Sequence, residues 1–130
     1  LKPGNIMLRK DGSIALIDFG LAKKARLEAE ITDKGEIFGT PYYMSPEQGH
    51  GNGVDERSDI YSLGVVFHEM LTGEKPYRAD TAMGIIYLHA NAPIPLLPTR
   101  FSEYQALLNM LLAKSPADRL QSAAEIDEWL

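Results

Sequence analysis

The sequence predicts an α+β fold that is mostly helical and carries one short β-hairpin near its start. Three observations support this prediction. Two short apolar runs at residues 6–8 and 13–17 flank an Asp-Gly turn, helical patterns follow residue 55, and 45% of the 130 residues are hydrophobic. That length and apolar content suffice for one domain with a hydrophobic core.

The expected hairpin joins Ile6–Leu8 to Ser13–Ile17 through a turn at Lys10-Asp11-Gly12. Asp and Gly tolerate the left-handed backbone that a tight turn needs. The first strand follows Asn5, and the second leads directly into Asp18. Two oxygen-bearing side chains that are distant in sequence should therefore meet at one edge of the hairpin, a geometry that suits a shared cation.

A long irregular segment follows, because the periodicity disappears between Leu21 and Tyr43. It is charged and contains Gly and Thr, and it is longer than a loop that only connects two elements of a compact domain usually is. We expect it to be functional or disordered.

The longest helix is expected from Asp55 to Thr72, ending before Gly73. Its apolar residues cover most of the circumference rather than one stripe, so this helix should be a buried central pillar. Asp80 can cap a second helix that runs through Ala90.

A Pro-rich stretch at residues 93–98 then interrupts the helical pattern. Further helices are expected at residues 103–113 and from residue 123 onward. Two capping boxes would open them, one formed by Ser102 with Gln105 and the other by Ser122 with Glu125. The five Met residues and Trp129 are expected to fill the core.

Composition excludes several classes of function. The net charge is −5, and residues 36–130 carry six Lys and Arg against thirteen Asp and Glu, which argues against nonspecific nucleic-acid binding. The most hydrophobic stretch, residues 60–71, is interrupted by polar residues, so no membrane segment is expected. The sequence has no Cys and its three His are scattered, which disfavours disulfides and a Cys/His metal site.

Four short motifs occur in order along the chain: Leu1-Lys2-Pro3-Gly4-Asn5, Asp18-Phe19-Gly20, Gly39-Thr40-Pro41 and Ser45-Pro46-Glu47. Each alone would be weak evidence, but the ordered set resembles the C-terminal lobe of a serine/threonine protein kinase, with variants such as Ser45 that suggest a bacterial one. The resemblance implies that residues 1–130 are part of a kinase domain and that the N-terminal lobe is absent from them. Residues 18–47 would form the activation segment, and residues 55–130 the helices of the lobe.

The resemblance also implies roles for individual residues. Asn5 and Asp18 would hold the Mg²⁺ or Mn²⁺ that accompanies ATP, because Leu1-x-x-x-Asn5 matches the spacing of the catalytic loop. Lys2 would steady the transferred phosphate, and Thr40 would position the substrate hydroxyl. The catalytic Asp is expected immediately before Leu1, so the chain alone is expected to be inactive.

Two threonines are candidates for phosphorylation, Thr32 and Thr40. Thr32 lies among several Lys and Arg residues that could clamp a phosphate and thereby order the activation segment. An incidental threonine in a solvated charged loop is an equally good interpretation of Thr32.

Three more residues receive structural roles by resemblance. Glu47, which closes the activation segment, would pair with Arg119, and Asp59 would accept hydrogen bonds from the catalytic-loop backbone at the start of the central helix. Tyr61 stands where many kinases have Trp, a conservative departure in aromatic bulk.

The leading interpretation is therefore a protein serine/threonine kinase that transfers the γ-phosphoryl of ATP to protein hydroxyls in the cytoplasm, with dimerisation possible for autophosphorylation. A pseudokinase, which would keep the helical lobe as an interaction module without catalysis, is the main alternative. A helical binding domain with coincidental motifs is the third.

Overall fold

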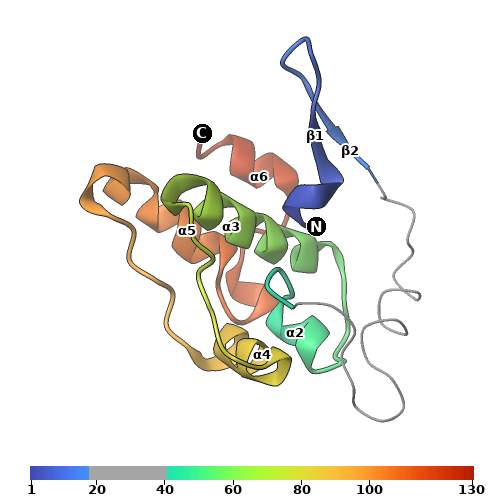
Figure 1. The fold of residues 1–130 in the computed structure, drawn as a ribbon, viewed down its shortest axis with the longest axis vertical. Coiled ribbons are helices and arrows are strands. Elements are labelled where there is room, and N and C mark those ends of the chain that lie inside the picture. The colour runs from blue at the N-terminus through green and yellow to red at the C-terminus, as the bar shows by residue number, and fades with distance from the viewer. Residues whose placement is uncertain (18–40) are drawn as a thin grey trace.

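The computed structural model describes residues 1–17 and 41–130. A small hairpin stands at one side of a helical body, and helix α3 runs through the middle of that body (Figure 1). The described part is thus mostly helical with one two-stranded antiparallel sheet, as the α+β prediction requires. No helix in these two ranges is long and apolar enough to cross a membrane.

The hairpin consists of β1 (Ile6–Leu8) and β2 (Ile14–Leu16), preceded by the short 3-10 helix η1 (Pro3–Asn5). Ile6 pairs with Leu16 in the antiparallel register. The Asp-Gly turn is confirmed, because Gly12 has a φ of +85° and the Asp11 carboxylate accepts a hydrogen bond of 2.9 Å from the Ser13 amide. The second strand is one residue shorter at each end than predicted.

Helix α3 (Glu56–Thr72) is the expected central pillar. Asp55 caps its start by accepting from the Arg57 amide at 2.9 Å, and Gly73 ends it with a φ of +76°. Two clusters of buried apolar residues pack around α3 and α5 (Gln105–Leu111), one with Ile60 and the other with Tyr61.

Gly64 lets α3 and the α5 region approach closely. A Cβ at this position would lie 2.8 Å from the Leu111 Cβ and 2.9 Å from a Leu112 methyl group. Any larger side chain would push the two helices apart, so the core packing depends on this glycine.

The remaining helices are short and surround α3 (Figure 1). Helix α2 (Pro46–Gly49) follows the segment at residues 41–45, and α4 (Ala82–Asn91) packs beside it. The 3-10 helix η2 (Thr99–Tyr104) leads directly into α5, and η3 (Pro116–Asp118) precedes α6 (Ala123–Asp127).

Two of the predicted helix caps are wrong. Thr81, not Asp80, caps α4, because its hydroxyl accepts from the Gly84 amide at 3.0 Å. Ser102 forms no capping box, because residues 99–104 are a 3-10 helix. The Gln105 side chain instead accepts from the Leu97 amide at 2.7 Å, which satisfies backbone left free by the Pro-rich stretch.

The third predicted cap is half correct. The Ser122 hydroxyl accepts from the Glu125 amide at 3.4 Å, but the Glu125 carboxylate accepts from Gln121 rather than closing the box. A complete capping box occurs at Ser45 and Gln48, which match the same pattern of Ser followed three residues later by Gln.

The prediction that the methionines and Trp129 fill the core is largely wrong. Met44 is buried and Met110 packs against the core, but Met7, Met70 and Met83 are exposed and Trp129 is 47% exposed. Met70 lies in the last turns of α3, where its neighbour Leu71 packs against the core, but the Met70 side chain itself is 76% exposed.

Candidate functional site

Asn5 lies where η1 meets the base of the hairpin. The backbone amide of Asn5 donates to the Lys2 carbonyl at 3.0 Å, and the backbone carbonyl of Asn5 accepts from the Ile17 amide at 2.8 Å. Asn5 is 8% exposed, whereas Lys2 is exposed. The hairpin thus brings Ile17, the residue before Asp18, directly beside Asn5, while Asp18 itself lies outside the described residues.

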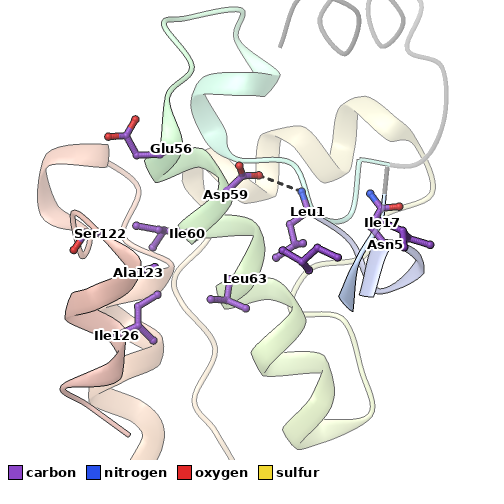
Figure 2. Close-up of a pocket in the computed structure, with 11 residues that line it drawn as sticks. Leu1, Asn5, Ile17, Glu56, Asp59, Ile60, Leu63, Ser122, Ala123 and Ile126 are labelled. Carbon is purple, nitrogen blue, oxygen red and sulfur yellow. Dashed lines mark hydrogen bonds and ion pairs between the residues drawn. The ribbon is translucent and has the colours of Figure 1, made fainter. Parts of the chain in front are cut away.

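A cavity of about 300 Å³ opens next to this junction, between the hairpin, the start of α3 and α6 (Figure 2). Its lining is mostly apolar and includes Leu1, Leu63 and Ile126, with Glu56 and Asp59 among its few polar residues. None of the described residues that line it is Lys or Arg. Such a lining does not suit the phosphates of a nucleotide, which need cations or free amides.

Asp59, which lines this cavity, contacts the first residue of the chain. Its carboxylate lies 3.3 Å from the nitrogen of Leu1, as the dashed line in Figure 2 marks. The structure therefore joins the start of α3 to Leu1, while the role of Asp59 as an acceptor for the catalytic-loop backbone stays a prediction.

Glu47 and Arg119 form a buried ion pair. Two Arg119 nitrogens donate to the two Glu47 carboxylate oxygens at 2.6 and 2.7 Å, and the residues are 7% and 2% exposed. Ser58 adds a hydrogen bond of 2.7 Å to Glu47. Burial alone would raise the pKa of Glu47, but the hydrogen bonds from Arg119 and Ser58 outweigh it and lower the pKa to about 2.

Arg119 also ties three backbone carbonyls together. Its remaining N–H groups donate to Ala113, Arg57 and Lys114 at 2.8, 2.9 and 3.1 Å. The guanidinium thus uses all of its donor groups, and its carbon lies 4.9 Å from the Tyr61 ring centroid. This pair fixes the end of the segment at residues 41–47 against the C-terminal helices.

Two residues of α3 form hydrogen bonds with Tyr43 and thereby anchor residues 41–44. The Ser62 hydroxyl donates to the Tyr43 carbonyl at 2.6 Å, and the Tyr43 hydroxyl donates to Glu69 at 2.5 Å. Burial is the main cause that raises the pKa of Tyr43, and the Glu69 carboxylate raises it further. No sequence motif indicates these two α3 residues.

A second buried polar cluster lies between α3 and α4. The Tyr61 hydroxyl lies 2.8 Å from His89 Nδ1, and Lys114 donates to the Tyr77 hydroxyl at 3.0 Å. Burial, together with the positive charge of Lys114, lowers the pKa of His89 to about 4. Burial also lowers the pKa of Lys114 to about 8. These buried groups could not be recognised from scattered His and Lys residues in the sequence.

The structure therefore brings together Asn5 with Ile17, Leu1 with Asp59, and Glu47 with Arg119. Asp18, Thr32 and Thr40 lie outside the described residues. Lys2 is exposed beside Asn5, at the surface of η1.

A hairpin that joins Asn5 to the residue before Asp-Phe-Gly, and a central helix that anchors residues 43 and 47, are features of the C-terminal lobe of protein kinases. The family model for the protein kinase domain matches residues 1–129, and the chain belongs to this family.

Bacterial serine/threonine kinases are among its relatives. The chain is 39% identical to serine/threonine-protein kinase PknB of Mycobacterium leprae and 41% identical to PknB of Mycolicibacterium smegmatis, in both cases over 97% of the chain. It is also 41% identical to PknL of Mycobacterium tuberculosis over 95% of the chain. The chain spans about 21% of the length of the PknB proteins and 32% of PknL.

Proposed function

We propose that the protein containing this chain is a serine/threonine kinase that moves the γ-phosphoryl group of ATP to protein hydroxyls. The observation that supports this most directly is the hydrogen bond between Asn5 and Ile17. It places a buried amide side chain beside the residue that precedes Asp18, and family membership and the named relatives agree with this proposal.

In this proposal Asn5 and Asp18 hold the divalent cation. The donor chemistry fits, since an amide oxygen and a carboxylate are hard ligands of the kind that Mg²⁺ or Mn²⁺ takes. The cation bound to ATP would neutralise charge on the phosphates. The chain's own contribution is to keep Asn5 fixed through backbone hydrogen bonds at both its amide and its carbonyl.

Lys2 and Thr40 are proposed to act on the substrate side. Lys2 is exposed and directly precedes η1, so its ammonium can reach a phosphate group from solvent. Thr40 directly precedes the anchored residues 41–44 and would orient the acceptor hydroxyl.

We place this chemistry in the cytoplasm, where ATP is available, and expect protein substrates with Ser or Thr acceptors. Autophosphorylation at Thr32 or Thr40, in a dimer, would be the activating event. Intact-mass and peptide mass spectrometry of the active protein would detect it, and an unmodified segment in fully active protein would refute it.

The metal role of Asn5 is tested with Asn5→Leu in the full-length protein. Leu keeps the volume but removes the oxygen, so kcat should fall roughly 100-fold, the scale for loss of one electrostatic contact to a transition state. The Mg²⁺ concentration needed for half-maximal activity should rise as well. Radiolabelled phosphate transfer to a protein acceptor is the measurement.

Leu8→Ala provides the matched control, because Leu8 is 73% exposed on the same hairpin. It should leave activity within about 2-fold. A wild-type protein that binds ATP but transfers no phosphate would favour the pseudokinase instead.

A further inference from the structure

Lys75 makes two contacts beyond the end of α3. Its ammonium lies 3.3 Å from a Glu69 carboxylate oxygen and 4.9 Å from the centroid of the Tyr42 ring. The side chains of Lys75 and Glu69 are each only 26% exposed, so water screens this ion pair less than a fully exposed one. Lys75 therefore bridges a carboxylate of α3 and an aromatic ring of the segment at residues 41–44.

Glu69 also forms a hydrogen bond with Tyr43, the residue after Tyr42. Its other carboxylate oxygen accepts the hydrogen bond of 2.5 Å from the Tyr43 hydroxyl, and the Tyr43 carbonyl accepts from Ser62 on the same helix. The Tyr43 hydrogen bond is the main cause that lowers the pKa of Glu69, and the charges of Lys75 and Arg78 lower it further. Glu69 therefore stays ionised and can hold Lys75 and Tyr43 together.

The two consecutive tyrosines, Tyr42 and Tyr43, are held by different kinds of contact. Tyr43 is tied to α3 at both its carbonyl and its hydroxyl, whereas the Tyr42 ring lies against the Lys75 ammonium. Lys75 itself belongs to the connection between α3 and α4, outside any helix or strand. Among the described residues, the Lys75 side chain that Glu69 holds in place therefore contributes to the orientation of the Tyr42 ring.

We propose that Lys75 is a positioning residue for the acceptor peptide, acting through Tyr42 and Glu69. This inference rests on the proposed function, in which Thr40 orients the acceptor hydroxyl, so that the peptide next to the acceptor lies against residues 41–44. Lys75 keeps these residues in one arrangement before the peptide binds. Peptide binding then needs less ordering, and the gain appears in the affinity for peptide rather than in phosphoryl transfer.

The test is Lys75→Met in the full-length kinase, which removes the charge and keeps the length of the side chain. The substrate is a single-threonine synthetic peptide that the wild-type enzyme selects from a degenerate library. The KM for this peptide should rise about 3- to 10-fold, the size expected for one partly shielded ion pair and one cation–π contact. The kcat and the KM for ATP should stay within about 2-fold.

Lys75→Arg should restore the peptide KM to within about 2-fold, because Arg keeps both the charge and the contact with an aromatic ring. Lys10→Met is the matched control, since Lys10 is exposed in the hairpin turn. It should change none of these constants. An unchanged peptide KM in Lys75→Met, or equal changes in kcat and both KM values, would overturn the positioning role.

A second measurement does not depend on catalysis. Hydrogen–deuterium exchange at the amides of Tyr42, Tyr43 and Met44 should be about 3- to 10-fold faster in Lys75→Met than in wild type, and should return to the wild-type rate in Lys75→Arg. Unchanged exchange would refute the inference even in an inactive protein. An inactive wild-type protein whose exchange responds as expected would refute the proposed function, and with it the role toward an acceptor peptide, but not the ordering of residues 42–44 by Lys75.

Discussion

Replacement of Arg119 by Ala should be among the most damaging single changes in this chain. The substitution removes both hydrogen bonds to Glu47 and leaves a carboxylate that is 7% exposed with Ser58 as its remaining side-chain donor. It also removes the N–H groups that donate hydrogen bonds to the carbonyls of Ala113, Arg57 and Lys114. The loss therefore combines an unpaired buried charge with several backbone acceptors that lose their partner.

The magnitude follows from these contacts. Removal of one partner of a buried ion pair costs about 3 to 5 kcal/mol, and folded domains have only about 5 to 15 kcal/mol of unfolding free energy in total. The cavity left by the guanidinium can admit water to the carbonyls, so we take the pair itself as the dominant contribution. At about 2 to 4 °C per kcal/mol for a domain of this class, the melting temperature should fall by roughly 6 to 20 °C.

The assay is urea denaturation and thermal melting of the full-length protein, with Arg9→Ala as a matched control. Arg9 is exposed on the hairpin, and its contact with Ser13 is 3.4 Å long, so this control should cost less than about 1 kcal/mol. The double variant Glu47→Gln with Arg119→Met should lose less than the sum of the two single variants, because it leaves no unpaired charge. Arg119→Ala with a free energy of unfolding within about 1 kcal/mol of wild type would refute the reasoning.

Two further predictions concern the core. Because burial lowers the pKa of His89 from 6.5 to about 4, the unfolded chain binds a proton that the folded chain does not, and stability should fall as the pH drops from about 6.5 to about 4. Denaturant titrations across this range should show the slope, His89→Gln should flatten it by about one proton, and an unchanged slope in that variant would contradict the assignment. Gly64→Ala should lower the free energy of unfolding by about 1 to 3 kcal/mol, because the new Cβ would lie 2.8 Å from Leu111, and melting equal to wild type would show that the helices can separate freely.

Much of the fold could be predicted from short stretches of sequence. The turn at Gly12 and the stop at Gly73 were expected, and both are present, while the helix expected from Asp55 begins at Glu56 with Asp55 as its cap. These features depend on backbone conformations and hydrogen bonds within about four residues, so the residues that decide them are neighbours in the chain.

The candidate site was predicted in a different way. Asn5 beside the residue before Asp18 follows from hairpin geometry, whereas the pairing of Glu47 with Arg119, separated by 72 residues, came only from the resemblance to kinases. No local pattern encodes that pair, because its geometry depends on how α2 meets the segment after α5. Its three additional backbone acceptors were not expected at all.

The sequence by itself determined the family, the hairpin, the central helix and the order of the motifs, because these depend on local conformation and on ordered residue types. The tertiary structure decided which residues are buried and which are joined. Met70 lies on the central helix yet is exposed, and Lys75 lies in a connection yet links Tyr42 to Glu69. Burial and long-range pairing depend on what packs from distant parts of the chain, and that information is not contained in any single stretch of sequence.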